Sequence, residues 1–249
     1  MCTVTYLPLN DGYIITSNRD EKLVRIQSEY PRVFEVNGEK ILFPRDGEKG
    51  GTWIASSEKG RTLCLLNGAF LPHTPHPPYR KSRGLVVLDF FEMKPVQQLA
   101  SNAMLDDIEP FTLLIAENKL LFELRWDGYK KYFIRLNETE AQIRSSVTLY
   151  SAEVIALRER LFRDWLAKHN QYRIYDILQF HLFTGTGDAA NDLTMSRGGI
   201  VKTVSITSTI ISGDSQNMYY SDLKTPGKVE FLSTSFDSSS ALPNLSVTP

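Results

Sequence analysis

The sequence predicts an α+β fold with a large share of antiparallel β-sheet. Short runs of β-branched and aromatic residues are joined by tight turns rich in Gly and Asn, which is typical of hairpins. Two pairs of helical segments interrupt these strands, so the predicted order is strands, helices, strands, helices, strands. Helices in two blocks among antiparallel strands favour two stacked sheets with helices on both outer faces.

The first predicted hairpin pairs residues 3–7 with residues 13–17 across a turn around Asn10-Asp11-Gly12. Cys2 precedes the first strand, and the polar run 18–21 follows the second. Facing residues of an antiparallel pair have a constant sum of residue numbers. The hairpin therefore brings the polar run close to the thiol.

Three registers of this hairpin remain open. A two-residue loop at positions 10–11 places Cys2 opposite Arg19. A loop at positions 11–12 places it opposite Glu21, and a three-residue loop selects Asp20.

Later strands are predicted from alternating or continuous apolar runs. Asn37-Gly38 is typical of a type I′ turn, and residues 63–66 are typical of a strand buried on both faces. Cys64 in that strand is expected to be core filler, because apolar surroundings raise a thiol pKa. The predicted strands are 33–36, 40–43, 52–56, 61–66, 111–116, 120–126, 131–136, 147–150, 200–211, 217–223 and 228–232.

Helices are predicted at 85–93, 95–104, 151–169 and 172–183 from capping residues and 3.6-residue periodicity. In the third helix Arg158, Arg160 and Arg163 are expected on the solvated side. His181, on the apolar face of the fourth, is expected to be a satisfied core histidine rather than a catalyst. The Pro-rich segment 71–79 is expected to be a surface loop.

Composition limits the function classes. The 249 residues carry a net charge of −1 without a basic stripe, which argues against nucleic acid or an anionic membrane as the main partner. Two cysteines exclude a disulfide framework, and neither a signal peptide nor an apolar run of membrane-spanning length is recognisable. We expect a cytoplasmic protein with a small-molecule substrate or ligand and no integral membrane association. Its oligomeric state is left open.

Cys2 is the candidate nucleophile. Removal of Met1 would leave Cys2 with both a thiol and a free α-amine, whose reference pKa of about 7.7–8.0 suits a base near neutral pH. Arg19 beside the sulfur would favour the thiolate. Asp20 could orient the amine or a substrate. The alternative is an exposed hairpin end with a solvated charge run and Cys2 as a small apolar filler.

Two further sites have a functional and a structural interpretation. Asn67 ends a buried strand before Gly68, where its amide could donate to an oxyanion or simply form a turn. His73 and His76 are three residues apart but lack a neighbouring Cys, Asp or Glu, so no metal site is predicted.

Four sequence elements together resemble the NRDE family, the transport-and-Golgi-organisation 2 family. They are Met-Cys at the start, Asn18-Arg19-Asp20-Glu21, Gly50-Gly51-Thr52-Trp53 and Leu66-Asn67. This family is related to N-terminal-nucleophile (Ntn) hydrolases of the choloylglycine and penicillin V acylase type. The resemblance is clear over about residues 1–90. It implies an αββα sandwich of two mainly antiparallel sheets flanked by helices, spanning residues 1–232, before a disordered Ser-, Thr- and Pro-rich tail at 233–249.

The resemblance also implies roles for individual residues. Cys2 matches the nucleophile, Arg19 and Asp20 match the charged pair around it, and Asn67 matches the oxyanion donor. Substrate-binding candidates are Asn18, Glu21, Trp53 and Arg197. The family's Thr-Arg-Ser-Ser-Thr-Val-like stretch is matched only by Ser196-Arg197 and, after an insertion, Thr203-Val204-Ser205. Asn191 is the candidate for a later active-site Asn of the choloylglycine enzymes.

Two functions remain open from the sequence. The first is an amidohydrolase that uses Cys2 on a small acyl-amide and needs no cofactor. The second is a non-catalytic carrier in membrane traffic that binds haem or an acyl-lipid. In the second case Cys2, His73 or His76 could serve as an axial haem ligand.

Overall fold

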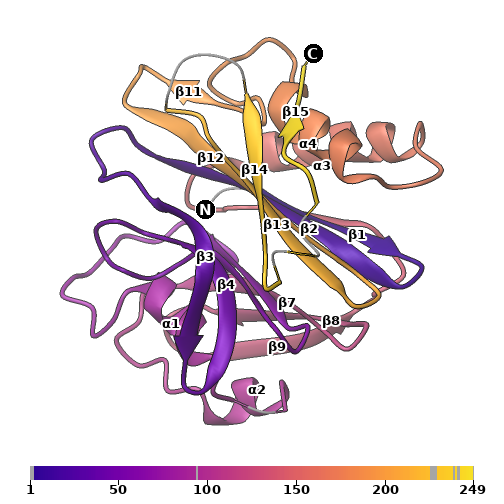
Figure 1. The fold of residues 1–249 in the computed structure, drawn as a ribbon. Helices are drawn as coiled ribbons and strands as arrows, with labels where there is room; N and C mark the ends of the chain where they lie inside the picture. The colour runs from indigo at the N-terminus through magenta and orange to yellow at the C-terminus, as the bar shows by residue number, and fades with distance from the viewer. Residues whose placement is uncertain (1–2, 94, 225–228, 238, 240–241, 249) are drawn as a thin grey trace. The chain divides into compact units, whose positions relative to one another are not determined.

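A computed structural model describes residues 3–93, 95–224, 229–237, 239 and 242–248. The chain divides into two compact units, which Figure 1 shows with their helices and strands. Unit 1 contains the described residues of 1–25, 139–146 and 150–249. Unit 2 contains those of 26–138 and 147–149. Cys2, the predicted nucleophile, lies outside the described residues.

Unit 1 is built on an antiparallel sheet in the order β10-β1-β2-β12-β13-β14-β15, with β11 paired to β12. Residues far apart in sequence are therefore neighbours, because β2 pairs directly with β12. The strands are β1 Thr3–Leu9, β2 Gly12–Lys22, β10 Gln142–Ser145, β11 Ser196–Arg197, β12 Val201–Ser212, β13 Ser215–Asp222, β14 Glu230–Ser235 and β15 Leu245–Ser246.

The β1–β2 hairpin closes with a two-residue loop at Asn10-Asp11. Thr3 pairs with Asn18, and Leu9 pairs with Gly12. This is the first of the three registers left open by the sequence. β2 also continues as a regular strand through the polar run to Lys22, because β12 pairs with it along that length.

Two helices, α3 (Ala152–Leu166) and α4 (Ile174–Phe183), pack on one face of this sheet. The hydroxyl of Ser151 accepts the Val154 N–H and caps α3, as predicted. Phe162 of α3 and Ile177 of α4 join Leu7 and Ile14 in one apolar cluster. The helices thus bury their periodic apolar stripe against β1 and β2.

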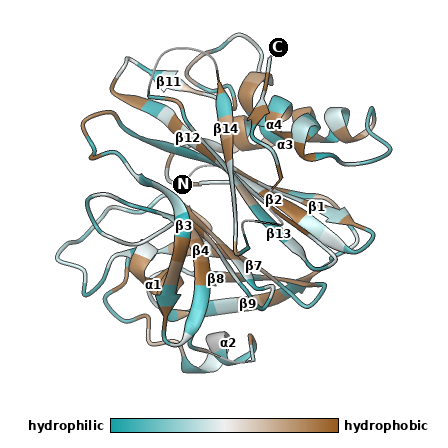
Figure 2. Cartoon of the chain, viewed as in Figure 1, coloured by the Kyte–Doolittle hydropathy of each residue, from teal (hydrophilic) through white to brown (hydrophobic). Residues whose placement is uncertain are grey.

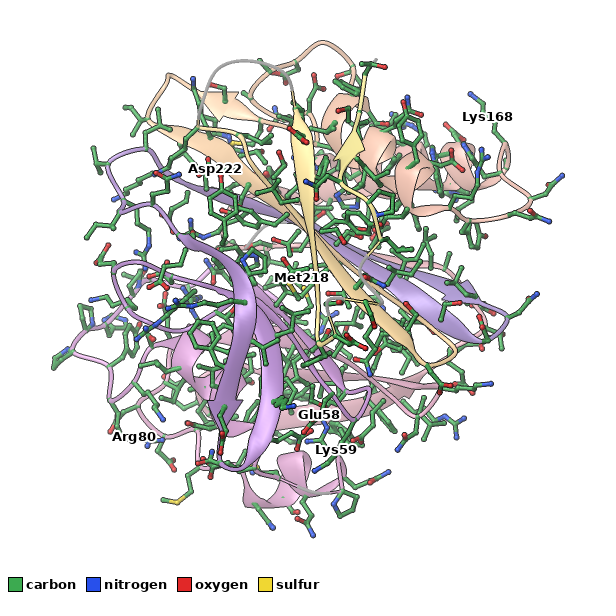
Figure 3. The ribbon with its side chains drawn as sticks, viewed as in Figure 1. Glu58, Lys59, Arg80, Lys168, Met218 and Asp222 are labelled. Carbon is green, nitrogen blue, oxygen red and sulfur yellow. The ribbon has the colours of Figure 1, made fainter. Side chains whose placement is uncertain are left out.

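Unit 2 contains a second antiparallel sheet in the order β3-β4-β5-β6-β7-β8-β9. Asn37 and Gly38 both have positive φ, 51° and 74°, as the predicted type I′ turn requires. Glu58 and Lys59 lie in the exposed turn between β5 and β6 (Figure 3). The strands are β3 Glu29–Val36, β4 Glu39–Arg45, β5 Ile54–Ser57, β6 Thr62–Asn67, β7 Phe111–Glu117, β8 Leu120–Trp126 and β9 Lys131–Leu136.

The helices of unit 2 are shorter than predicted. α1 covers Arg83–Asp89 and α2 only Gln98–Asn102. Phe90 caps α1 through its backbone, and its buried ring joins the core formed with β6, β7 and β8. The apolar residues that follow α1 are therefore held by core packing without continuing the helix. Segment 71–79 has neither helix nor strand, as predicted.

Two further segments differ from expectation. Residues 147–150, predicted as a strand, form a turn, and the strand lies earlier as β10, which pairs with β1. Within segment 233–249, β14 extends to Ser235 and β15 pairs with β14, which the Ser, Thr and Pro content did not indicate. The division into one domain and a disordered tail stays a prediction. Within the described part of the chain, no helix is both long and apolar enough to cross a membrane.

Candidate functional site

Three of the predicted site residues lie side by side on the last part of β2. Asn18, Arg19 and Asp20 are 0%, 4% and 6% exposed, so the charged pair is buried rather than part of a solvated hairpin end. Burial of charged side chains requires specific polar partners. The contacts of each of these residues therefore define the site.

The Asp20 carboxylate accepts two hydroxyl hydrogen bonds from distant segments. Tyr150 donates to Oδ2 at 2.5 Å, and Thr203 donates to Oδ1 at 2.5 Å. Thr203 pairs with Asp20 across β2 and β12, next to a β-bulge between Thr203 and Ser205. The Thr203 hydroxyl also accepts the Met195 N–H at 2.9 Å. Asp20 is thus held in one orientation by hydroxyls from two separate segments of unit 1, the turn at Tyr150 and strand β12.

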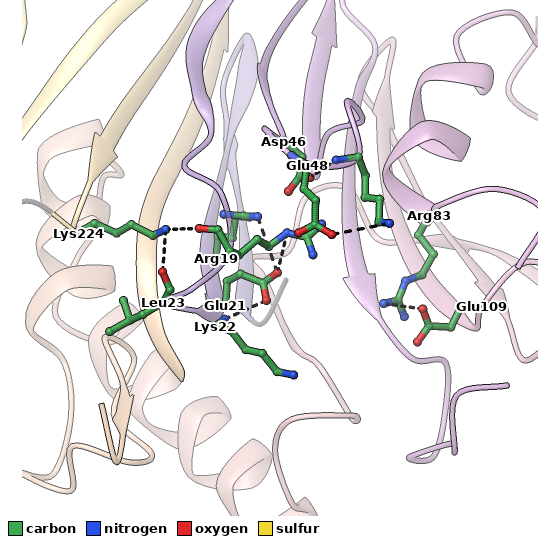
Figure 4. A network of polar contacts seen from close by, with 11 residues as sticks. Arg19, Glu21, Lys22, Leu23, Asp46, Glu48, Arg83, Glu109 and Lys224 are labelled. Atoms are coloured by element: carbon green, nitrogen blue, oxygen red, sulfur yellow. Dashed lines mark hydrogen bonds and ion pairs between the residues drawn. The ribbon is translucent and has the colours of Figure 1, made fainter. Parts of the chain in front are cut away.

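Arg19 faces Glu21 on the same side of β2. Its guanidinium lies 3.7 Å from a Glu21 carboxylate oxygen, which is also 3.5 Å from Nε of Arg25 (Figure 4). The other Glu21 oxygen accepts the Lys22 N–H at 2.9 Å. Glu21 therefore links two guanidinium groups at the end of β2.

The insertion in the predicted C-terminal motif forms a tight turn. Arg197 of β11 pairs with Val201 of β12, and Gly198 and Gly199 between them have φ of 56° and 67°. This turn keeps both halves of the motif in one part of unit 1. The central carbon of the Arg197 guanidinium lies 5.1 Å from the ring centroid of Tyr150, the tyrosine that contacts Asp20.

Asn191 contacts the same arginine. Its side-chain oxygen accepts from Arg197 at 3.2 Å, and its amide donates to Asp188 at 2.7 Å. Asn191 thus lies beside a predicted binding residue, and its match to a catalytic Asn stays a prediction.

The prediction that Arg158 of α3 lies on the solvated side of the helix is wrong, because the residue is only 1% exposed. Its guanidinium donates to the Thr3 hydroxyl and to the carbonyls of Asn191 and Asp192. Its central carbon lies 3.7 Å from the Tyr150 ring centroid. These partners carry no charge, so hydrogen bonds and a cation–π contact stabilise the buried cation. Arg158 thereby joins the start of β1 to the tyrosine that contacts Asp20.

His181 of α4 is a satisfied core histidine, as predicted. It is fully buried, with Nδ1 2.5 Å from the Asn18 side-chain oxygen and Nε2 2.8 Å from the Thr5 hydroxyl. The Asn18 amide donates to the carbonyls of Leu193 and His181, so its oxygen faces Nδ1 and the proton belongs on Nδ1. Burial and the positive charge of Arg158 lower the pKa of His181 to about 3. A neutral imidazole thus links β1, β2 and α4.

Asn67 and Trp53 lie in unit 2. Asn67 ends β6 and pairs with Phe111, as predicted for a strand-end amide. Gly68 follows with φ of 81°, and a Cβ there would lie 2.7 Å from methyl groups of Val147 and Thr148. Only glycine therefore fits after Asn67. Trp53 is 3% exposed. That either residue joins the Asp20 cluster, or that Trp53 lines a pocket, stays a prediction.

His73 and His76 each make a contact within unit 2. Nε2 of His73 lies 3.2 Å from Glu109, and the His76 N–H donates to Tyr79. Among the described residues no group of three or more His, Cys, Asp or Glu side chains could hold a metal ion.

Sequence reasoning missed Tyr150 and Arg158. Tyr150 stands in a turn and Arg158 alternates with other arginines along α3, so neither has a local pattern that distinguishes it. Thr203 carried a weak signal as part of the interrupted motif. Its contact with Asp20 depends on the pairing of β2 with β12.

A family model described as Transport and Golgi organisation 2 matches residues 1–173. No curated protein matches the chain. Among solved structures, the chain is similar to a conjugated bile acid hydrolase from Clostridium perfringens, solved as its mutant C2A. The identity is 12%, the TM-score is 0.58, and the match covers 100% of this chain and 97% of that one.

The chain is also similar to the Caenorhabditis elegans ortholog of N-acylethanolamine-hydrolyzing acid amidase. Here the identity is 11%, the TM-score is 0.51, and the match covers 86% of this chain and 93% of that one. At these identities the likeness concerns the fold. It confirms the predicted Ntn-hydrolase-like fold with two mainly antiparallel sheets and flanking helices.

Proposed function

This chain belongs to the Transport and Golgi organisation 2 family, and we propose that it is an amide-bond hydrolase with Cys2 as its nucleophile. The observation that carries the proposal is the β1–β2 register, in which Thr3 pairs with Asn18. One further residue of the same register would bring Cys2 beside Arg19. The two similar structures are named as hydrolases of a conjugated bile acid and of N-acylethanolamines, which supports a small acyl-amide as substrate.

The proposed reaction has two steps. After removal of Met1, the α-amine of Cys2 accepts the thiol proton, and the thiolate attacks the amide carbonyl carbon. The carbon–nitrogen bond then breaks, the leaving amine takes the proton from the α-ammonium, and a thioester remains. Water attacks the thioester, releases the carboxylic acid and restores the thiol.

In this proposal Asp20 and Arg19 have separate roles. Asp20 orients the α-amine, because the hydroxyls of Tyr150 and Thr203 fix both oxygens of its carboxylate. Arg19 provides positive charge near the sulfur, which favours the thiolate. Asn67 is proposed to donate to the oxyanion, with its position fixed by β6 and Gly68.

Arg158 is proposed as a positioning residue. It donates to the Thr3 hydroxyl, one residue after the nucleophile, and packs against Tyr150, which contacts Asp20. It therefore holds the start of β1 and the carboxylate in one arrangement. Cys2 supplies both the nucleophile and the base in this proposal, and a fixed start of β1 preorganises the two groups for the reaction.

The test begins with intact-mass measurement of protein from its native host, where loss of Met1 is expected. The processed protein is then assayed for amine release from a panel of N-acylethanolamines and N-acyl amino acids. Hydrolysis is expected in the wild type and is lost in Cys2→Ala. Asp20→Ala is expected to lower kcat/KM by about 10²–10⁴-fold.

Asp214→Ala is the matched control, because Asp214 lies in the exposed turn between β12 and β13. It should leave kcat/KM unchanged. Full activity of Cys2→Ala, or of protein that retains Met1, contradicts the proposal. If the processed wild type hydrolyses nothing in the panel, the hydrolase proposal fails and a carrier function becomes the better account.

A further inference from the structure

Three aliphatic side chains project from one end of the unit 1 sheet and form what we call the apolar tip: Leu23, Val24 and Ile200. They are 36%, 91% and 68% exposed. The Leu23 N–H donates to the Ile200 carbonyl at 3.0 Å, so the two segments lie side by side beyond the pairing of β2 with β12. Figure 2 shows hydrophobic colouring on the loop that leaves β2.

The backbone around Ile200 does not require an apolar side chain there. The β11–β12 turn uses Gly198 and Gly199 in left-handed conformations, and Ile200 follows them immediately. A tight turn of this kind needs no apolar side chain for its geometry. Single exposed aliphatic residues are normal on protein surfaces, but three from two adjoining segments form a patch.

Three lysines stand near the residues of the apolar tip. Lys22 and Lys202 flank it on β2 and β12, and Lys224 donates its ammonium to the carbonyls of Leu23 and Arg25 at 3.4 and 2.7 Å (Figure 4). The Lys224 charge is therefore held at the tip by the backbone that carries the aliphatic residues.

The acidic groups at this end of the sheet offset only part of that charge. Glu21 is engaged with Arg19 and Arg25, and Asp222 accepts the Lys224 N–H. The net charge of −1 is a sum over the whole chain, so it does not reveal the local excess of cations at this end of the sheet.

We propose that the apolar tip docks reversibly into the surface of a lipid bilayer that contains anionic lipids. Aliphatic side chains with lysines beside them match the two layers of such a surface, the apolar acyl chains inside and the anionic headgroups outside. A stable protein partner is disfavoured, because three side chains fall well short of the ~800 Å² that each side of a specific interface buries. The inference does not depend on the proposed hydrolase activity.

The test measures binding of the full chain to vesicles by flotation. One set of vesicles is phosphatidylcholine alone, and the other contains about one fifth phosphatidylserine. Wild type is expected to float with the phosphatidylserine vesicles and to dissociate as salt rises, because the headgroup attraction is screened. The double variant Val24→Asp/Ile200→Asp is expected to lower the vesicle-bound fraction about tenfold or more.

A matched control replaces two equally exposed apolar residues of unit 2. Leu71 and Met104 are 76% and 75% exposed, and Leu71→Asp/Met104→Asp should float like wild type. Lys22→Glu/Lys202→Glu is expected to remove only the preference for phosphatidylserine. All these side chains are at least partly exposed, and thermal unfolding of each variant checks that it folds.

Three results overturn the proposal. One is no flotation of wild type with phosphatidylserine vesicles. The second is unchanged flotation of Val24→Asp/Ile200→Asp. The third is an equal loss in the unit 2 control, which would indicate non-specific adsorption.

Discussion

The central strands of the two units bury different kinds of side chain. In unit 1, β1, β2 and β12 bury hydroxyl, amide and charged groups, including Thr5, Thr16, Asn18 and Asp20. In unit 2, β6, β7 and β8 bury mainly aliphatic groups such as Leu63, Leu113, Ile115 and Leu124. The hydrophobic effect that favours aliphatic burial is non-directional, whereas buried polar groups must each meet a partner. The difference indicates that the interior of unit 2 mainly stabilises the fold. Part of the interior of unit 1 instead holds polar side chains in fixed positions.

The aliphatic interior of unit 2 gives the largest expected effect on stability. Leu113 of β7 is fully buried in the core with α1, so Leu113→Ala should lower the free energy of unfolding by about 2–5 kcal/mol. Leu113→Met conserves volume and should cost less than about 1.5 kcal/mol. Urea unfolding measures both. Equal losses in the two variants would contradict a close-packed core at this position.

The polar interior of unit 1 should respond to pH through His181. Its pKa is about 3 in the folded chain against 6.5 as the ordinary value, so below pH 6.5 the unfolded chain binds a proton that the folded chain does not. The stabilising contribution is complete above pH 6.5 and is lost as the pH falls toward 3. Between pH 7 and 5 the free energy of unfolding should fall by about 2 kcal/mol.

His181→Gln is the control for this pH effect, since glutamine does not titrate and can still contact Asn18 and Thr5. The difference between wild type and His181→Gln in urea unfolding should shrink as the pH falls. A difference that stays constant from pH 7 to 5 would show that the imidazole is protonated in the folded chain.

The smallest expected change in stability comes from removing single hydroxyl groups of β2. It should differ between a hydroxyl with a hydrogen-bond partner and one without. The Thr16 and Ser208 hydroxyls form a hydrogen bond of 2.7 Å, whereas the buried Ser17 hydroxyl has no partner among the described residues. Thr16→Val should therefore cost about 1 kcal/mol or more, and Ser17→Ala should be neutral or slightly stabilising. Unfolding midpoints compare the two. A larger loss for Ser17→Ala would show that its hydroxyl has a partner in solution.

Most of the fold could be predicted because its signals are local. The type I′ turn at Asn37-Gly38, the Ser151 cap of α3 and the hairpin of β1 with β2 each lie within a few residues. Elements without such signals were misplaced. The strand expected at 147–150 lies instead at Gln142–Ser145, since its place is decided by pairing with β1.

The candidate site was predictable only in part. Arg19 and Asp20 stand out in sequence as a polar run after an apolar strand. The expected solvation of Arg158 was wrong, because its contacts with Thr3, Tyr150 and the 191–192 backbone come from the packing of α3.

The sequence by itself determined the strand and helix order, the closeness of positions 18–21 to the chain start, and the candidate nucleophile. Only the tertiary structure decided the β1–β2 register and the partners of Asp20. Tyr150 and Thr203 stand 130 and 183 residues from Asp20, and no local pattern encodes a contact over that distance. Such contacts depend on which strands and turns pack together. Because the Asp20 carboxylate is buried there, it needs hydrogen-bond donors, and the hydroxyls of Tyr150 and Thr203 provide them.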